Sequence, residues 1–422
     1  MRIVQINTFP YKATGNIMMN IHHLLTEAGH DSYVVWGRGR KAISDHEIVI
    51  GDDFGVRLHG LYTRLTDKTG FASKIATRRL KTILEEIKPD IIHLHNVHGY
   101  YINLPILFNY IKENQIKVVW TLHDCWAFTG HCAFFDMCGC NKWKTGCGHC
   151  EQLKTYPSSI GKDNSSWNWK EKKKLFSGLE GVIVTPCNWL ERLVKQSFLR
   201  DYSTHVIYNG IDRSIFKPTT ECNLLKKYEF DKRPIILGVA SEWTERKGLK
   251  DIIALAKRMP NYQFVVVGLT KEQKKKIPKT IRGLERTENV HELVALYSAA
   301  SLFFNPTYED NFPTTNIEAL ACGTPLLTYD TGGSPEAVIS SKVGRVIKKD
   351  STSKINIKLV AKNIEEMMSS LSDSELNRKD DMGESSENES IALMCREASK
   401  RFDKDMQLRK YIPLYESIMS EL

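Results

Sequence analysis

The sequence predicts an α/β fold made of two doubly wound, Rossmann-like domains in tandem. Its 422 residues exceed what one hydrophobic core usually organises, so two domains of roughly 200 residues are expected. Short apolar runs alternate with helical patterns, which is typical of βαβ units around a parallel sheet. The alternation stops near residue 211 and then restarts. Two such sheets in tandem are expected to leave a cleft that faces the carboxyl ends of both sets of strands. Ligands bind at these strand ends in folds of this kind.

The expected strands are short apolar runs. In the first domain they are 3–6, 33–36, 91–94, 118–122, 182–185 and 206–207, and in the second they are 235–239, 264–267, 302–304 and 326–328. Helical segments lie between them, such as 17–27, which ends in a helix-stop signal at Ala28 and Gly29. We expect domains at 1–212 and 213–400, and a C-terminal helix within 401–422 that packs back toward the first domain. The polar stretch 369–390 is expected to be a loop or partly disordered.

The net charge of +9 is concentrated in the first half of the chain. Residues 1–217 hold 28 Lys and Arg against 20 Asp and Glu, a balance of +8. Such a basic half fits an anionic partner: a phosphate-bearing substrate, a nucleic acid or an anionic membrane surface. The chain has no run of about 18 apolar residues, and its first residues resemble a strand rather than a signal peptide. We therefore expect a cytoplasmic protein, in which disulfides are rare.

The segment 305–336 carries the most informative pattern. A predicted strand ends at residue 304, and Pro313 opens a helix with Thr314 and Thr315 in its first turn. A helix N-terminus offers unpaired N–H groups and partial positive charge, which suit a phosphate. Asp310 and Glu318 flank this anion site, and carboxylates accept hydrogen bonds from hydroxyl groups such as those of a ribose or hexose. The segment therefore predicts a site for phosphate and sugar together.

This segment resembles the carboxylate–x7–carboxylate motif of family 4 retaining glycosyltransferases, which have the GT-B fold. The resemblance covers nearly the whole chain. It implies that Glu318 binds ribose hydroxyls and that Asp310, which stands where most members have Glu, binds the sugar of a UDP- or GDP-sugar donor. Asn311, Phe312 and Pro313 replace a common Gly-Phe-Gly, and proline removes one backbone N–H from the phosphate site. The helix start at Thr314 and Thr315 completes the implied donor site.

The resemblance also implies a phosphate-binding loop after the first strand of the second domain. Lys247 matches a lysine that neutralises the donor diphosphate in the family. The position that usually holds arginine, six residues earlier, is Ser241, and Arg246 is a candidate to supply that charge instead. Developing charge on a leaving diphosphate needs a nearby cation. Because the sequence has no Asp-x-Asp metal motif, we expect Lys247 and helix dipoles to act without an obligatory divalent ion.

Three motifs of the first domain follow predicted strands. Gly15 and Asn16 stand where the family places a glycine loop against the donor phosphate or the acceptor. His123 matches a histidine that hydrogen-bonds the donor sugar in the family. The histidines at 93, 95 and 98 also follow a strand, and a structural role is the more frequent one for buried histidines of this kind.

Six of the ten cysteines fall in the segment 123–168, which we interpret as an insert. Cys147 and Cys150 form a CxxC pair, and with Cys132 and Cys140 they would make a tetrathiolate set suited to structural zinc. The spacing between Cys132 and Cys140 is not a standard zinc spacing, and Cys138 could replace Cys140. Free thiols, disulfides or an iron–sulfur site remain alternatives. A similar insert occurs in one branch of polysaccharide-biosynthesis glycosyltransferases.

The function implied by the resemblance is retaining transfer of a sugar from a nucleotide sugar to a saccharide acceptor in cell-surface polysaccharide assembly. The alternatives are a nucleotide-sugar enzyme of another class on the same fold, such as an epimerase, and a zinc-stabilised nucleic-acid-binding protein. A lipid-linked acceptor at the inner face of a membrane would explain the basic first half. The predicted helix 188–199 could then contact anionic lipid, because Leu190, Leu193, Val194 and Phe198 form an apolar arc between basic residues. The alternative, which is the more frequent one for such an arc, is that this face packs on the sheet.

Overall fold

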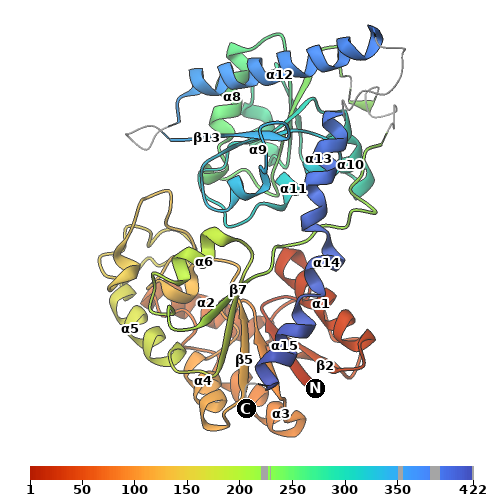
Figure 1. The fold of residues 1–422 in the computed structure, drawn as a ribbon. Coiled ribbons are helices and arrows are strands. Elements are labelled where there is room, and N and C mark those ends of the chain that lie inside the picture. Colours follow the sequence, from red (N-terminus) through yellow and green to blue (C-terminus); the bar gives the residue numbers. More distant parts are fainter. Residues whose placement is uncertain (220–226, 229, 350–354, 381–389, 421–422) are drawn as a thin grey trace. The chain divides into compact units, whose positions relative to one another are not determined.

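The computed structural model describes residues 1–219, 227–228, 230–349, 355–380 and 390–420. The chain forms two compact units, Met1–Asn209 with Gln407–Leu422, and Gly210–Met406 (Figure 1). Each unit is a parallel sheet with helices around it. The predicted class, α/β with two doubly wound domains, is confirmed.

The sheet of the N-terminal unit has seven strands in the order β3-β2-β1-β4-β5-β6-β7, and every pairing in it is parallel. The strands are β1 Arg2–Asn7, β2 Asp31–Trp36, β3 Glu47–Val49, β4 Ile91–Leu94, β5 Lys117–Thr121, β6 Gly181–Thr185 and β7 Ser203–Val206. The helices are α1 Lys12–Glu27, α2 Asp53–Thr66, α3 Lys74–Ile87, α4 Leu104–Glu113, α5 Ser165–Phe176, α6 Asn188–Val194 and the C-terminal α15 Tyr411–Ser420. Buried residues of α1 and α15 share one apolar cluster with β1, β4, β5 and β6.

The sheet of the C-terminal unit has six parallel strands in the order β10-β9-β8-β11-β12-β13. They are β8 Ile235–Val239, β9 Gln263–Val267, β10 Ile281–Leu284, β11 Leu302–Asn305, β12 Leu326–Tyr329 and β13 Gly344–Ile347. The helices are α8 Leu249–Arg258, α9 Lys271–Lys276, α10 Val290–Ala299, α11 Thr314–Ala321, α12 Ile357–Asp380, α13 Ile391–Ser399 and α14 Lys404–Leu408. The strand order reverses between β8 and β11, which is the switch point where such sheets bind ligands.

The structure departs from the expected elements at three places. Strands β3, β10 and β13 were not predicted, because each is short and only partly buried. Helix α1 begins at Lys12 rather than near residue 17. Residues 369–380 continue α12 instead of forming a loop, and 381–389 of that polar stretch lie outside the described residues.

Candidate active site

Three loops of the C-terminal unit converge at the switch point, after β8, β11 and β12. Two glycines allow the backbones of these loops to lie in close contact. A Cβ on Gly248, whose φ is +75°, would lie 2.1 Å from the carbonyl oxygen of Pro306. A Cβ on Gly332, whose φ is +55°, would lie 1.7 Å from the carbonyl oxygen of Asp310. Only glycine allows these backbones to approach so closely, which explains the glycines that follow Lys247 and Thr331.

The loops after β8 and β11 exchange charged contacts. Lys247, at the end of the short 3-10 helix Glu245–Lys247, forms an ion pair with Asp310, and both side chains are less than one-fifth exposed. The neighbouring Arg246 donates from Nη1 to the carbonyl oxygen of Glu309 at 2.8 Å. Ser241 lies exposed in the same loop as Lys247. The structure therefore brings the expected cations and the first motif carboxylate to one place.

Helix α11 begins beside this ion pair. Its N-cap is Pro313, which makes no side-chain capping bond, and Thr314 and Thr315 are partly exposed in its first turn. Asn311 and Phe312 precede it and are buried, with the Phe312 ring 5.5 Å from that of Phe402. A helix start without a capping side chain leaves backbone N–H groups for an anion.

Glu318 lies one turn into α11, and a side chain from a different helix hydrogen-bonds to its carboxylate. The hydroxyl of Tyr297, on α10, donates to its Oε2 at 2.9 Å. Burial raises the pKa of Glu318, and hydrogen bonds from the hydroxyls of Tyr297 and Thr314 oppose that rise. Further hydroxyl donors, such as those of a ribose, would stabilise the ionised form in the same way. Tyr297 was not anticipated, because it lies 21 residues before Glu318 and belongs to no motif.

Buried amides and hydroxyls fix the backbone under the site. Asn305 donates to the side-chain oxygen of Asn316 at 2.7 Å, and Asn316 donates to the carbonyl oxygen of Ser334 at 3.2 Å. Thr331 donates to the carbonyl oxygen of Thr307 at 2.7 Å. These bonds tie β11, α11 and the loop after β12 into one preorganised frame.

Two family models match consecutive parts of the chain and together cover most of it. The model described as Glycosyltransferase Family 4 matches residues 14–215, and the model described as Glycosyl transferases group 1 matches residues 222–387, which include every donor-site residue above. The chain is a family 4 glycosyltransferase.

A curated relative also matches most of the chain. WcaC of Escherichia coli (strain K12), whose name assigns it to glycosyl transfer in colanic acid biosynthesis, is 25% identical over 83% of this chain and 88% of its own. Among solved structures, sucrose-phosphate synthase from Thermosynechococcus elongatus has a TM-score of 0.70 at 14% identity, with all of both chains covered. WaaG, a glycosyltransferase involved in lipopolysaccharide biosynthesis, has a TM-score of 0.62 at 13% identity, covering 97% of this chain and 98% of its own. These structures support the GT-B fold.

Three histidines of this glycosyltransferase, at positions 93, 95 and 123, lie at or next to the carboxyl ends of β4 and β5 in the N-terminal unit. The His123 ring nitrogen Nε2 is 3.1 Å from Nδ1 of His95, which in turn contacts Gln5. Burial lowers the pKa of His123 to about 4. His93 contacts Thr121 and Tyr415, so it connects β4 to β5 and to α15. At neutral pH these rings are uncharged hydrogen-bonding groups.

Gly15 and Asn16 lie inside α1 rather than in a loop that precedes it. A Cβ on Gly15 would lie 2.6 Å from the carbonyl oxygen of Phe9, so glycine is required for α1 to pack against the end of the β1 loop. Asn16 is exposed on the helix. Both residues lie near the start of the helix that follows β1, and their expected contact with the donor phosphate or the acceptor stays a prediction.

The expected zinc ligands are not found as a metal site. Within the described ranges, no group of three or more His, Cys, Asp or Glu is arranged to hold a metal ion, and all nine cysteines there are free. Cys132 and Cys150 hydrogen-bond each other, while the Cys147 sulfur accepts the backbone N–H of Gly130 at 3.1 Å. Cys140 lies in a turn, with its N–H on the carbonyl oxygen of Phe135.

Aromatic packing stabilises the insert. The rings of Phe128 and Phe135 lie 5.2 and 5.1 Å from that of Trp143. Lys172 of α5 is buried, with Nζ 3.8 Å from the centre of a Trp126 ring and 2.6 Å from the Trp126 carbonyl oxygen. The insert thus has a core of its own that joins α5.

The helix expected to contact lipid faces inward. Leu190, Val194 and Leu199 are fully buried and Phe198 nearly so, because α6 and the turn after it pack on the sheet. Leu193, the remaining member of the predicted arc, is partly exposed, so the structure supports the reading in which this apolar face packs on the sheet. None of the helices in the described ranges is long and apolar enough to cross a bilayer.

Proposed function

We propose that this glycosyltransferase moves a sugar from a UDP- or GDP-sugar to a saccharide acceptor with retention of anomeric configuration. The arrangement of Lys247, Asp310 and Glu318 around the start of α11 carries the proposal. It combines one cation, one helix N-terminus and two carboxylates within one preorganised frame. These are complementary to a diphosphate that carries a sugar on one side and a ribose on the other.

Each group has a role in this proposal. Lys247 and the N–H groups of α11 hold the diphosphate, and Arg246 adds charge to the same loop. Glu318, oriented by Tyr297, accepts hydrogen bonds from the ribose, and Asp310 accepts them from the sugar. For His123 we keep the role that the family resemblance implies, a hydrogen bond to the donor sugar.

Retention follows if the acceptor attacks from the face that the diphosphate leaves. The bond from the anomeric carbon to the diphosphate oxygen breaks, a bond to the acceptor oxygen forms on the same face, and the leaving diphosphate takes the acceptor proton. Lys247 and the α11 N-terminus stabilise the charge that develops on the diphosphate. Under this proposal transfer proceeds without an obligatory divalent ion, and turnover in excess chelator tests that point.

We further propose a lipid-linked saccharide as acceptor, in assembly of a cell-surface polysaccharide. Support comes from WcaC and from relatives whose names carry lipid acceptors. The processive diacylglycerol alpha-glucosyltransferase of Acholeplasma laidlawii is 27% identical over 36% of this chain and 49% of its own. A structure of Anabaena HepE with UDP and glucose, with a TM-score of 0.64 at 16% identity, supports the choice of a nucleotide sugar.

The test is nucleotide binding by Glu318→Gln. The amide keeps the size of the side chain and an oxygen for Tyr297, but it lacks the charge that strengthens bonds from ribose hydroxyls. We expect at least tenfold weaker binding of whichever of UDP and GDP the unmodified protein binds, measured by calorimetry, which corresponds to about 1.4 kcal/mol.

Glu365→Gln, at an exposed position of α12, is the matched control and should bind as the unmodified protein does. Equal affinity of the Glu318 and Glu365 variants would refute the assigned role. The configuration of the new linkage, read from the anomeric proton of the product by NMR, tests retention separately.

A further inference from the structure

Helix α2 carries a row of apolar side chains on its outward face. Phe54 is 71% exposed, and Leu58, Leu61 and Leu65 are 50–55% exposed. Their spacings of four, three and four residues place all of them on one side of the helix. The row is about 16 Å long at the rise of an α-helix.

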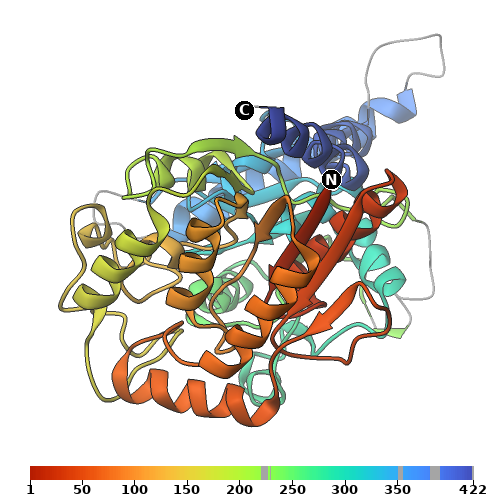
Figure 2. The same cartoon turned by 90° about the horizontal axis from the view of Figure 1, so that it is seen from below.

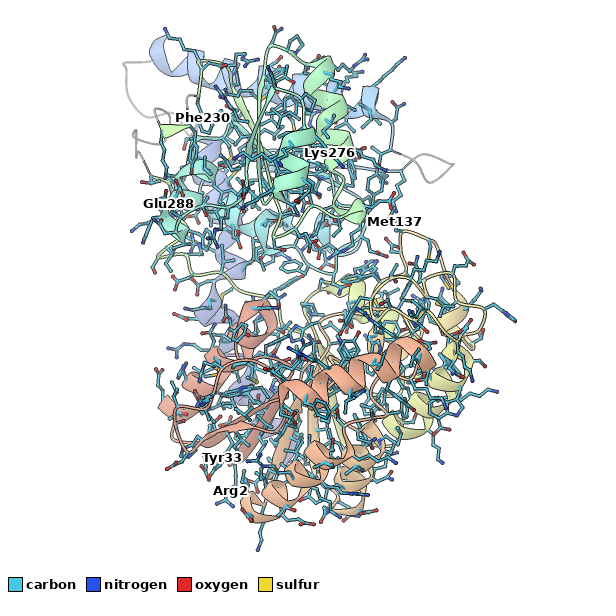
Figure 3. The ribbon with its side chains drawn as sticks, turned by 180° about the vertical axis from the view of Figure 1, so that it is seen from behind. Arg2, Tyr33, Met137, Phe230, Lys276 and Glu288 are labelled. Atoms are coloured by element: carbon cyan, nitrogen blue, oxygen red, sulfur yellow. The ribbon has the colours of Figure 1, made fainter. Side chains whose placement is uncertain are left out.

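The packing of α2 does not account for this row. The helix buries a different face, formed by Val56, His59 and Thr63, against the rest of the N-terminal unit. A helix packed on one face normally carries polar residues on the opposite one. In Figure 2, α2 runs along the lower edge of its unit, and in Figure 3 it crosses the front of that unit. A contiguous exposed apolar surface of this kind marks an interaction site.

The apolar surface continues past the end of α2. Ile160 is 80% exposed, and its backbone N–H donates to the carbonyl oxygen of Arg64 at 2.8 Å. Its loop therefore lies against the last turn of the helix. We call Phe54, Leu58, Leu61, Leu65 and Ile160 the α2 patch. Trp167 lies nearby, with Lys68 Nζ 4.0 Å from its ring centre.

Basic side chains accompany the α2 patch. Arg57 and Arg64 are exposed on α2, and Lys162 is exposed two residues after Ile160. In the part of the chain that the structure describes, none of the three forms an ion pair. The acidic residues of this helix lie at its start, where Asp52 accepts the N–H of Gly55 as the N-cap. The flank of the row is therefore positively charged.

We propose that the α2 patch is the surface through which this protein lies on an anionic lipid bilayer. Phe54 and the leucines enter the boundary between headgroups and acyl chains, while Arg57, Arg64, Lys68 and Lys162 contact lipid phosphates. Trp167 is placed for the headgroup level, which indole rings favour. The row is a convex helix ridge, and a fluid bilayer can surround such a ridge. The inference rests on the proposed function only for the lipid-linked acceptor that brings the enzyme to a membrane.

The test is flotation of the full chain with vesicles of phosphatidylcholine alone or with about 30% phosphatidylglycerol, which gives the surface a negative potential that attracts basic residues. We expect the protein to float with the anionic vesicles and at least fivefold less with the neutral ones. The double variant Leu58→Ser, Leu61→Ser should lose at least four-fifths of the bound fraction. Arg57→Gln with Arg64→Gln should reduce binding at low salt and weaken its salt dependence, because Lys68 and Lys162 remain.

The matched control is Leu359→Ser with Leu393→Ser, which changes two leucines of similar exposure on α12 and α13. This variant should float like the unmodified protein. Failure of the unmodified protein to float, or equal flotation of the two double-leucine variants, would overturn the proposal. So would a dimer in light scattering that only Leu58→Ser with Leu61→Ser dissolves, because the occupant would then be a second copy of the chain. Nucleotide binding should be unchanged in every variant, so failure here is distinct from failure of the proposed function.

Discussion

Replacing Gly332 by alanine should disable the donor site while leaving the fold in place. Gly332 has a φ of +55°, and a Cβ there would lie 1.7 Å from the carbonyl oxygen of Asp310. Real Cβ atoms essentially never lie within 3.0 Å of a heavy atom. The loops after β11 and β12 must therefore separate by more than about 1 Å, which moves Asp310 and strains the bonds from the Gly333 N–H to Asp310 and Asn311.

The size of the effect follows from two separate contributions. A left-handed backbone costs an alanine about 1–2 kcal/mol, which lowers stability. A displacement of about 1 Å at a reacting centre reduces the rate by about 100-fold, or about 2.7 kcal/mol in the barrier. We therefore expect a small fall in Tm and about a 100-fold fall in kcat/KM for the donor.

Gly29→Ala separates the two contributions. Gly29 has a φ of +80°, and a Cβ there would meet no heavy atom within 4 Å. It should lose similar stability and keep its activity. The measurements are thermal unfolding and transfer kinetics with the nucleotide sugar that supports turnover. If Gly332→Ala keeps kcat/KM within threefold of Gly29→Ala, the reasoning about the Asp310 loop is refuted.

Two further substitutions test other parts of the structure. Lys247→Gln removes the cation beside Asp310 and should weaken binding of UDP or GDP by at least tenfold in calorimetry. The reason is that a charge-assisted contact to phosphate contributes about 1.5–3 kcal/mol. The control Lys250→Gln, at an exposed position, should bind normally, and equal affinities of the two variants would contradict the role of Lys247. Burial lowers the pKa of His59 to about 4, so the unfolded chain takes up a proton below about pH 6.5 that the folded one refuses, and stability falls as pH drops from 6.5 to 4. His59→Gln should make that fall shallower by up to about 1.4 kcal/mol per pH unit in urea unfolding, whereas the exposed His23→Gln should not.

The donor-site residues of the C-terminal unit could be identified from sequence because they are close together along the chain. Asp310, Thr314 and Glu318 span a strand end, a loop and one helix, so local geometry already places them near one another. The contacts that complete the site come from distant segments. Tyr297, which orients Glu318, and Gly332, which sets the Asp310 loop, are close to them only because β11, α10 and β12 are assembled in one unit.

The strands that were missed and the zinc site that was not found have different physical causes. Strands β3, β10 and β13 have three or four residues each and only partly buried side chains, so periodicity cannot separate them from loops. The density of cysteines suggested metal ligands, but spacing does not fix the direction in which each thiol points. In the described residues Cys132 and Cys150 hydrogen-bond each other, and the Cys147 sulfur accepts a backbone N–H, so these thiols are neighbours without forming a recognisable metal site.

The sequence by itself determined the α/β class, the order of the main strands and the motif at the start of α11, because each depends on residues close in the chain. Only the tertiary structure decided which face of a helix is buried. The apolar arc at 188–199, for which lipid and the sheet were both candidates, packs on the sheet, whereas Phe54, Leu58, Leu61 and Leu65 of α2 face outward. Helical periodicity reports that a face is apolar, but the surface which that face contacts is set by segments far away in the chain.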